Sequence, residues 1–329
     1  MLKQTLKRAL IGSRTLRFAS RFAGSGVAMI MYHSVQDDPQ SQFDVLGGII
    51  HSTEVFRGQM EVLARDFNPV TLEDVLHFVK GKELPRRSVV VTFDDGYVDN
   101  HDVARGVLDR LGIPAVFYVT VDCVDRQTLP WPGQLRHMFL NAGAPSWNDP
   151  TGNGWPLQAR EKRLQAYAEA AKLCAKLSGD AQRGFLDSIQ GELQAPAISP
   201  QQPMMSWEQV RSLDRNGYTI GSHTMTHPSM AQICPKDAEL EFTESKRRLE
   251  QELRKTVVHF SYPCPSVWPH WADRTVDMSR EAGYLTAVTT AGGMVRMHDN
   301  PLTLTRIRPT KTVAGLRWNL ERTFCGAVV

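Results

Sequence analysis

The chain has 329 residues, of which 42% are apolar and 22% are charged, a composition that favours a folded globular protein over a disordered one. Removing the six cationic residues that precede Asp37, the first acidic residue, from the net charge of +3 leaves −3 for the remainder. That balance argues against nucleic acid as the main partner. The five cysteines are Cys123, Cys174, Cys234, Cys264 and Cys325. They are scattered and show no CxxC spacing, so they form neither a disulfide framework nor a zinc ribbon. This pattern fits a reducing, cytoplasmic location.

Residues 1–24 form a basic N-terminal segment in which apolar and cationic side chains alternate. This pattern is typical of an amphipathic helix that lies on an anionic membrane face, and a solvated leader is the alternative. No run of eighteen apolar residues is present to span a membrane. We therefore expect any membrane contact to be peripheral and to run through residues 1–24. The basic residues of the segment are Lys3, Lys7, Arg8, Arg14, Arg17 and Arg21.

From residue 25 the chain alternates between apolar runs typical of buried strands and segments with helical spacing. The first part predicts strands over residues 26–32, 88–93 and 115–120, and helices over 53–67, 71–80 and 99–111. The alternation stops at an insertion, about 121–204, in which residues 159–177 predict a long polar helix. It then resumes with helices over 206–216, 236–255 and 273–282, and strands over 218–221, 257–262, 285–289 and 304–307.

Repeated strand–helix units predict one α/β domain over residues 25–329, with a parallel sheet that is either open or closed into a barrel. In both forms, chemistry takes place at the carboxyl ends of the strands. Side chains that follow the predicted strands are therefore the first candidates for a functional site.

Two adjacent carboxylates, Asp94 and Asp95, follow the strand at 88–93 and precede Gly96. Like charges at adjacent positions disfavour joint ionisation unless a cation neutralises them. Adjacent residues also point in different directions, so one carboxylate can bind a metal while the other stays free. The alternative is a helix N-terminus, where acidic residues are favourable.

Two histidines, His223 and His227, follow the strand at 218–221 and are four residues apart. This spacing lets both rings face one ion, although a pair of surface histidines gives the same pattern. Together with Asp95 they complete the three-ligand set of a catalytic zinc, which leaves a position for water. The spare carboxylate of Asp94 is then a candidate general base.

A third histidine, His33, follows the first predicted strand. Hydrolysis of an amide needs a proton donor for the departing nitrogen, and histidine commonly fills that role near neutral pH. The alternative is a structural histidine at a strand end.

The motifs Thr92–Tyr97 (TFDDGY), Gly221–Pro228 (GSHTMTHP) and Phe260–Pro263 (FSYP) together resemble those of the polysaccharide deacetylases of carbohydrate esterase family four. The resemblance covers residues 27–309 apart from most of the insertion. It implies the NodB homology fold, a distorted (β/α) barrel with fewer than eight repeats, here with a mainly helical insertion. It also implies a metal-dependent hydrolase of carbon–nitrogen bonds other than peptide bonds, which removes an acetyl group from an N-acylated amino sugar.

The resemblance assigns a role to each candidate residue. Asp94 matches the catalytic base, while Asp95, His223 and His227 match the ligands of a divalent metal, expected to be Zn2+. Tyr32-His33 resembles the branch of the family that acts on exopolysaccharide, in which an N-terminal histidine is the catalytic acid. The C-terminal LxH motif of other branches is absent, and Arg306 stands in the comparable stretch, either paired with a site carboxylate or exposed on the surface.

The third motif departs from the family pattern Tyr-Pro-x-Gly, because Cys264 and Pro265 follow Tyr262-Pro263. The amide of Cys264 is retained and can still donate to an oxyanion, but Pro265 restricts the backbone at this point. Two alternative functions follow: a deformylase or deacetylase of a lipid-linked sugar at the cytoplasmic membrane, and a carbohydrate-binding protein without activity. The insertion tryptophans either line a glycan groove or serve packing: Trp131, Trp147 and Trp155.

Overall fold

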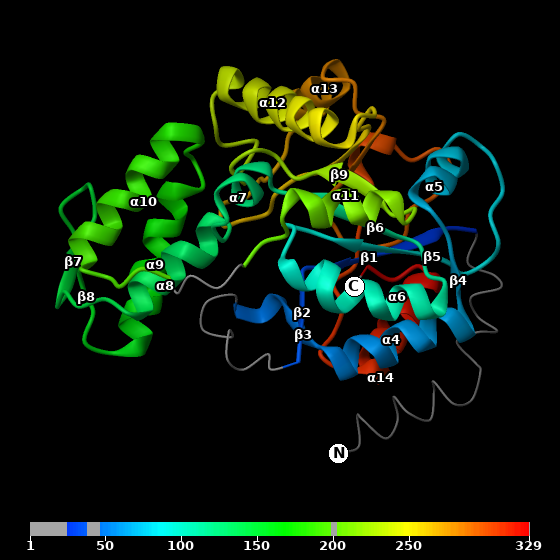
Figure 1. The fold of residues 1–329 in the computed structure, drawn as a ribbon, viewed down its shortest axis with the longest axis horizontal. Helices are drawn as coiled ribbons and strands as arrows, with labels where there is room; N and C mark the ends of the chain where they lie inside the picture. The colour runs from blue at the N-terminus through cyan, green and yellow to red at the C-terminus, as the bar shows by residue number, and fades with distance from the viewer. Residues whose placement is uncertain (1–24, 38–46, 199–202, 329) are drawn as a thin grey trace.

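A computed structural model describes residues 25–37, 47–198 and 203–328 of the chain, and Figure 1 shows its fold. The predicted amphipathic helix within residues 1–24 lies outside the described residues. The central feature is a curved parallel sheet in the order β1-β5-β6-β9-β10-β11, with the short strand β4 also paired to β5. Its strands are β1 Val27–Tyr32, β4 Asn68–Pro69, β5 Ser88–Phe93, β6 Ala115–Val119, β9 Thr219–Ser222, β10 His259–Ser261 and β11 Thr286–Val288.

The two edges of the sheet are joined by a segment that contacts both edge strands. Leu304 forms a parallel bridge with Val288 of β11, and Ile307 forms one with Ile30 of β1. Residues 304–307 thus make two single bridges in place of the predicted strand. The sheet therefore curls into a distorted, incomplete barrel, which confirms the predicted fold class.

The side chains of β5 point alternately to the outer and the inner face of the sheet, and each face belongs to a different hydrophobic cluster. Val89, Val91 and Phe93 belong to the hydrophobic cluster under the outer helices. Val90 belongs to a second cluster with the inner side chains of β1 and β6. Because side chains of a strand point to opposite faces in turn, Asp94 continues the inner row of Thr92. The strand thereby directs that carboxylate into the barrel.

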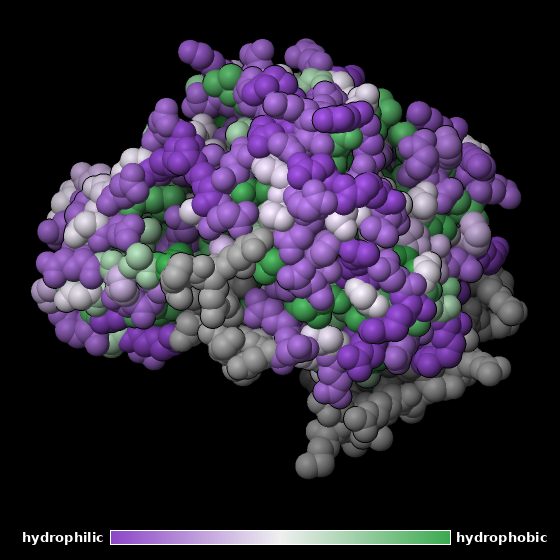
Figure 2. Space-filling model, viewed as in Figure 1, coloured by the Kyte–Doolittle hydropathy of each residue, from purple (hydrophilic) through white to green (hydrophobic). Residues whose placement is uncertain are grey.

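Helices cover the outside of the curved sheet, as Figure 1 shows. The face seen in Figure 2 is mainly hydrophilic with scattered apolar residues, as expected for helices whose apolar side faces the sheet. The predicted helix at 99–111 begins as a π-helical turn, η2 Asn100–Ala104, and continues as α6 Arg105–Leu111. The other helices of the main body are α4 Thr53–Asp66, α5 Leu72–Val79, α7 Val121–Arg126, α11 Trp207–Arg215, α12 Pro235–Leu253, α13 Asp273–Glu281 and α14 Val313–Phe324.

The insertion forms a helical lobe beside the main body, drawn in green at the left of Figure 1. The predicted long helix is α9, Arg160–Cys174. The lobe also contains α8 Trp131–Leu140, α10 Gly179–Leu193 and a hairpin of β7 Ser146–Asn148 with β8 Gly154–Pro156. These elements enclose a hydrophobic cluster of their own. None of the described helices is both long enough and apolar enough to cross a bilayer.

Candidate active site

The predicted site residues meet at the carboxyl edge of the parallel sheet. Asp94 and Asp95 follow β5, His33 follows β1, and His223 follows β9. Together with His227 they line one pocket with a cavity volume of about 520 Å³. Parallel strands end at the same edge, so residues far apart in the sequence are brought into one site.

The side chains of Asp95, His223 and His227 form a buried cluster in which one donor atom of each lies within 4.8 Å of the others. Nε2 of His223 lies 3.5 Å from Oδ1 of Asp95, and Nε2 of His227 lies 3.4 Å from the same oxygen. Ligands at about 2.1 Å from a tetrahedral zinc are about 3.4 Å apart. The separations therefore match those of atoms that share one cation.

Of the two ring nitrogens of His223, Nδ1 carries the proton, and Nε2 directs its lone pair toward Asp95. Nδ1 of His223 lies 2.8 Å from the carbonyl oxygen of Ser261, which can only accept a hydrogen bond, so Nδ1 carries the proton. Burial lowers the pKa of both His223 and His227, which keeps the rings neutral. Neutral imidazole is the form that binds a metal.

Within the part of the chain that the structure describes, one oxygen of the buried Asp95 carboxylate lacks the hydrogen bond that a buried charge requires, although the side chain of Tyr97 hydrogen-bonds to this carboxylate. Its Oδ1 has no hydrogen-bond partner among the described residues. Burial, and next the charge of Asp94, raise the pKa of Asp95 to about 8. An uncompensated carboxyl oxygen that faces two neutral imidazoles fits a divalent cation, so the three residues are consistent with a divalent metal site.

The backbone of the cluster is held in uncommon conformations. Asp95, Thr224 and His227 have φ values of 74°, 69° and 61°, in the left-handed region that residues other than glycine rarely occupy. Such conformations cost on the order of 1–3 kcal/mol each and persist where the surrounding structure enforces them. The loops after β5 and β9 are therefore specified by contacts around the site rather than by local preference.

Asp94 is paired with Arg306, whose side chain is only 1% exposed. The guanidinium donates to both carboxylate oxygens at 2.7 Å, and its other N–H groups donate to Thr92, Ser261 and the carbonyl of Thr289. Burial raises the pKa of Asp94, but the pairing with Arg306 outweighs burial and holds the pKa well below its usual range. The structure thus shows Arg306 in contact with a site carboxylate, and the surface alternative does not apply.

His33 lines the pocket from the end of β1, where its backbone is fixed by polar contacts. Its carbonyl accepts a hydrogen bond of 2.6 Å from Asn100, and the neighbouring Ser34 and Val35 donate to Asp99. Burial lowers the pKa of the His33 ring to about 4, against the opposing charge of Asp94. The ring is therefore placed in the same pocket as the metal-ligand cluster and Asp94.

Cys264 lies at the rim of the same pocket. Its thiol sulfur accepts a hydrogen bond from Thr290 at 3.3 Å and lies 3.4 Å from Nε2 of His270. Burial raises the pKa of this thiol, which keeps it protonated and unsuited to act as a nucleophile. Among the described residues, no acceptor takes the backbone amide of Cys264, so this donor stays available beside Pro265.

The helical lobe forms one wall of the pocket through Pro132, Gly133 and Arg136 of α8 and Tyr167 of α9. Trp131 and Trp147 are each only 2% exposed within the core of the lobe, and Trp155 packs against that core. These tryptophans therefore serve packing and do not line a groove. The indole N–H of Trp131 also donates to the carbonyl of His227 at 2.8 Å.

Three supporting residues escape prediction from the sequence. The indole of Trp131 donates to the carbonyl of His227, and the carbonyl of Ser261 accepts from the ring of His223. Glu241 of α12 accepts hydrogen bonds from the amides of Met225 (2.7 Å) and Thr226 (2.9 Å). These two amides belong to residues 223–229, the loop after β9 that carries both histidines and is called the metal-binding loop below. The sequence around Trp131 and Glu241 does not indicate these roles, because a tryptophan in an insertion and a glutamate in a polar helix are both common. Only Ser261, one residue before the Tyr-Pro pair, lies within a recognised motif.

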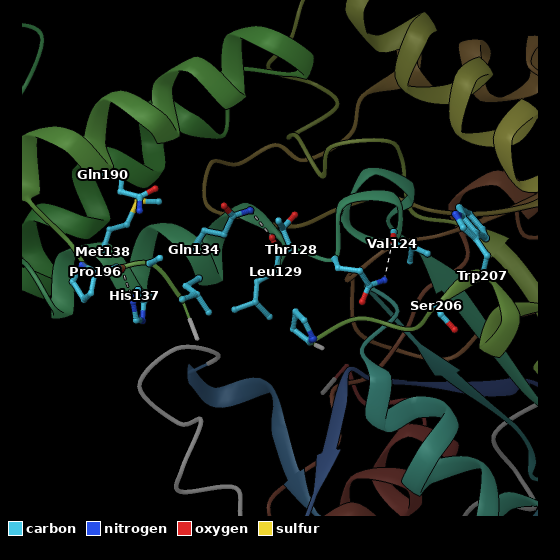
Figure 3. A pocket seen from close by; sticks show the side chains of 14 residues that line it. Val124, Thr128, Leu129, Gln134, His137, Met138, Gln190, Pro196, Ser206 and Trp207 are labelled. Atoms are coloured by element: carbon cyan, nitrogen blue, oxygen red, sulfur yellow. Dashed lines mark hydrogen bonds between the residues drawn. The ribbon is translucent and has the colours of Figure 1, made fainter. Parts of the chain in front are cut away.

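A larger cavity of about 750 Å³ lies between the lobe and the main body, and Figure 3 shows its lining. Leu129, Gln134 and Met138 line it from the lobe side, and Trp207 lines it from α11. It contains none of the predicted catalytic or metal-binding residues. We therefore place the candidate site in the smaller pocket, where the titratable groups converge.

Comparisons with known proteins relate this chain to one family. A family model described as polysaccharide deacetylase matches residues 81–287. YxkH of Bacillus subtilis (strain 168), provisionally named a polysaccharide deacetylase, is 24% identical over 292 residues, which cover 87% of this chain and 72% of YxkH.

Solved structures share the fold. The Streptococcus pyogenes deacetylase PplD in complex with acetate has a TM-score of 0.61 at 17% identity, over 91% of this chain and 98% of PplD. IcaB from Ammonifex degensii has a TM-score of 0.58 at 19% identity, over 90% of this chain and 98% of IcaB.

Proposed function

Because the chain belongs to the polysaccharide deacetylase family, we propose that it removes the acetyl group from an N-acetylated amino sugar of a polysaccharide or glycan precursor. One observation carries this proposal: a buried set of metal ligands adjoins an ionised carboxylate and a histidine in one pocket. This combination supplies what amide hydrolysis needs, namely an activated water, a base and a proton donor.

Each predicted site residue has a role in this proposal. Asp95, His223 and His227 would hold a divalent cation, which when bound polarises the acyl carbonyl and increases the acidity of water. Asp94 accepts a proton from the attacking water, for which its carboxylate is kept ionised by Arg306. The free amide of Cys264 donates to the developing oxyanion. The protonated form of His33, a small fraction near neutral pH because its pKa is lowered, donates a proton to the departing sugar nitrogen.

Two finer assignments belong to the same proposal. The position of His33 after β1, beside the metal-ligand cluster, supports the exopolysaccharide type of active site, in which the acid is supplied from the N-terminal part of the domain. Two histidines and one carboxylate are the ligand set of many catalytic zinc sites, which supports Zn2+ as the metal.

The direct test is incubation of the zinc-loaded protein with N-acetylated oligosaccharides, followed by mass spectrometry. We expect a loss of one acetyl group for each turnover, with acetate released in equal amount. The Asp94→Asn variant loaded with the same metal is the control. Absence of acetate release from every N-acetylated glycan supplied would reject the proposed activity.

Removal of a metal ligand should abolish both binding and catalysis. We expect His223→Ala to retain less than about one hundredth of the wild-type affinity for Zn2+, because the variant lacks one of three ligands. Turnover should fall with it. Metal content after dialysis is measured by elemental analysis, and a variant that keeps stoichiometric zinc would contradict the assignment of His223.

Replacement of the proposed acid should separate catalysis from metal binding. We expect His33→Gln to lower kcat by about 10²–10⁴-fold, because the amine then departs without a positioned proton donor. Zinc content should stay unchanged, since His33 is not part of the metal-ligand cluster. Steady-state kinetics on an N-acetylated oligosaccharide decide this, and a kcat within twofold of wild type would remove His33 from the mechanism.

The cationic residues of segment 1–24 favour a second candidate substrate, an N-acylated sugar linked to a membrane lipid. Co-sedimentation with anionic liposomes, with and without residues 1–24, distinguishes the two. Binding that depends on the segment favours the lipid-linked sugar, and equal recovery in the supernatant favours a soluble glycan.

A further inference from the structure

The two histidines of the metal-ligand cluster are held in different ways. The ring of His223 is fixed through its own Nδ1, which donates to Ser261. The ring of His227 has no such contact, because its buried Nδ1 has no hydrogen-bond partner among the described residues. A ligand ring without this outer hydrogen bond depends on its backbone for orientation.

The backbone of His227 needs external support. Its φ of 61° is unusual for a residue with a side chain, and Pro228 follows, which further restricts the conformations available to His227. Two contacts hold this residue in place. Its N–H donates to Oγ1 of Thr224 at 2.9 Å, and its carbonyl accepts from the indole of Trp131 at 2.8 Å.

The second of these contacts comes from the helical lobe. Trp131 is the first residue of α8, and its ring lies in the hydrophobic cluster of the lobe. Two more hydrogen bonds join the lobe side to the same loop: Ser229 donates to the carbonyl of Ala175 at 3.0 Å, and Gly179 donates to Thr226 at 3.2 Å. The lobe thus contacts the metal-binding loop on both sides of His227.

We propose that Trp131 is a positioning residue for the metal ligand His227, through which the helical lobe contributes to metal affinity. The indole N–H fixes the carbonyl of His227 and thereby the direction of its ring toward Oδ1 of Asp95, 3.4 Å away. This inference rests on the metal site of the proposed function. It adds that the insertion is part of the metal site although it supplies no ligand.

The test compares Trp131→Phe with Trp147→Phe in the full-length chain. The first variant removes the indole donor and keeps an aromatic ring in the lobe core. The second makes the same change at an equally buried tryptophan that packs edge-on against Phe139 and, among the described residues, forms no hydrogen bond with the metal-binding loop. Zinc affinity is measured by competition with a chromophoric chelator, and unfolding midpoints of the metal-free proteins report packing.

We expect Trp131→Phe to bind zinc about 10–100-fold more weakly than wild type, as loss of an outer contact to a metal ligand commonly causes. Trp147→Phe should bind zinc with wild-type affinity. Equal affinity of Trp131→Phe and wild type would overturn the proposal, and so would an equal loss in both variants, which would indicate packing alone. Zinc binding is measured without substrate, so a wild type that binds zinc but deacetylates nothing rejects the proposed activity and leaves this test intact.

Discussion

The Asp94→Asn variant should lose turnover by a factor of about 10²–10⁴, the usual contribution of a general base. The amide of asparagine cannot accept a proton from water, whereas the carboxylate of Asp94 is held ionised by Arg306. Metal content should stay at the wild-type level, because Asp94 is not one of the three clustered ligands. Acetate release and elemental analysis on the same preparation check both parts.

A control is needed because Asp94→Asn also leaves the buried guanidinium of Arg306 without its counter-charge. Chemical unfolding must show that the variant is folded at the assay temperature. Near-normal deacetylation by a folded, metal-loaded variant would contradict the role of Asp94 as base. Loss of zinc together with activity would instead point to a structural role for this carboxylate in the metal centre.

Much of the fold could be predicted from the sequence, because buried parallel strands carry a strong local signal. The run Ser88–Phe93 is rich in β-branched residues and fully buried, and the structure places it as an interior strand between β1 and β6. Other segments are harder to predict, because their structure depends on contacts with distant segments that the local sequence does not reveal. Residues 304–307 are predicted as a strand, but the structure joins them to β11 through Leu304 and to β1 through Ile307 by single bridges.

The insertion was harder to predict for a physical reason. Of its helices, α9 has the long unbroken helical composition that a sequence pattern detects, whereas α8 begins with Trp-Pro-Gly and α10 contains two glycines after its first turn. Glycine and proline reduce helix propensity, so these helices depend on the core that they share. Their existence follows from packing within the lobe.

The ligand cluster and the adjacent carboxylate follow from strand ends and spacing, because the chemistry requires those residue types at those positions. The supporting contacts do not. Trp131 and Glu241 act through hydrogen bonds to backbone groups of the metal-binding loop, and such contacts place no demand on sequence spacing. The pairing of Arg306 with Asp94 joins positions 212 residues apart, and only the curling of the sheet brings them together.

Replacement of Arg306 should have the largest effect on stability of any single change at the candidate site. All five N–H groups of this buried guanidinium are engaged, two of them by Asp94. Arg306→Met would leave the Asp94 carboxylate buried and unpaired, which costs about 3–5 kcal/mol of the free energy of unfolding. Urea or guanidinium unfolding of the metal-free protein measures this loss.

Two further variants separate the ion pair from simple loss of side-chain packing. The double variant Asp94→Asn/Arg306→Met removes both charges, so it should be less destabilised than Arg306→Met alone, because no buried charge is left without a partner. Arg308→Met changes an exposed arginine two residues along the same segment and should stay within about 0.5 kcal/mol of wild type. If Arg306→Met were as stable as Arg308→Met, the buried pair of Asp94 and Arg306 would make no measurable contribution to the stability of the fold. The unpaired Asp94 carboxylate is present in Arg306→Met and absent from the double variant. Equal instability of the two would therefore assign the loss to packing and not to the buried charge.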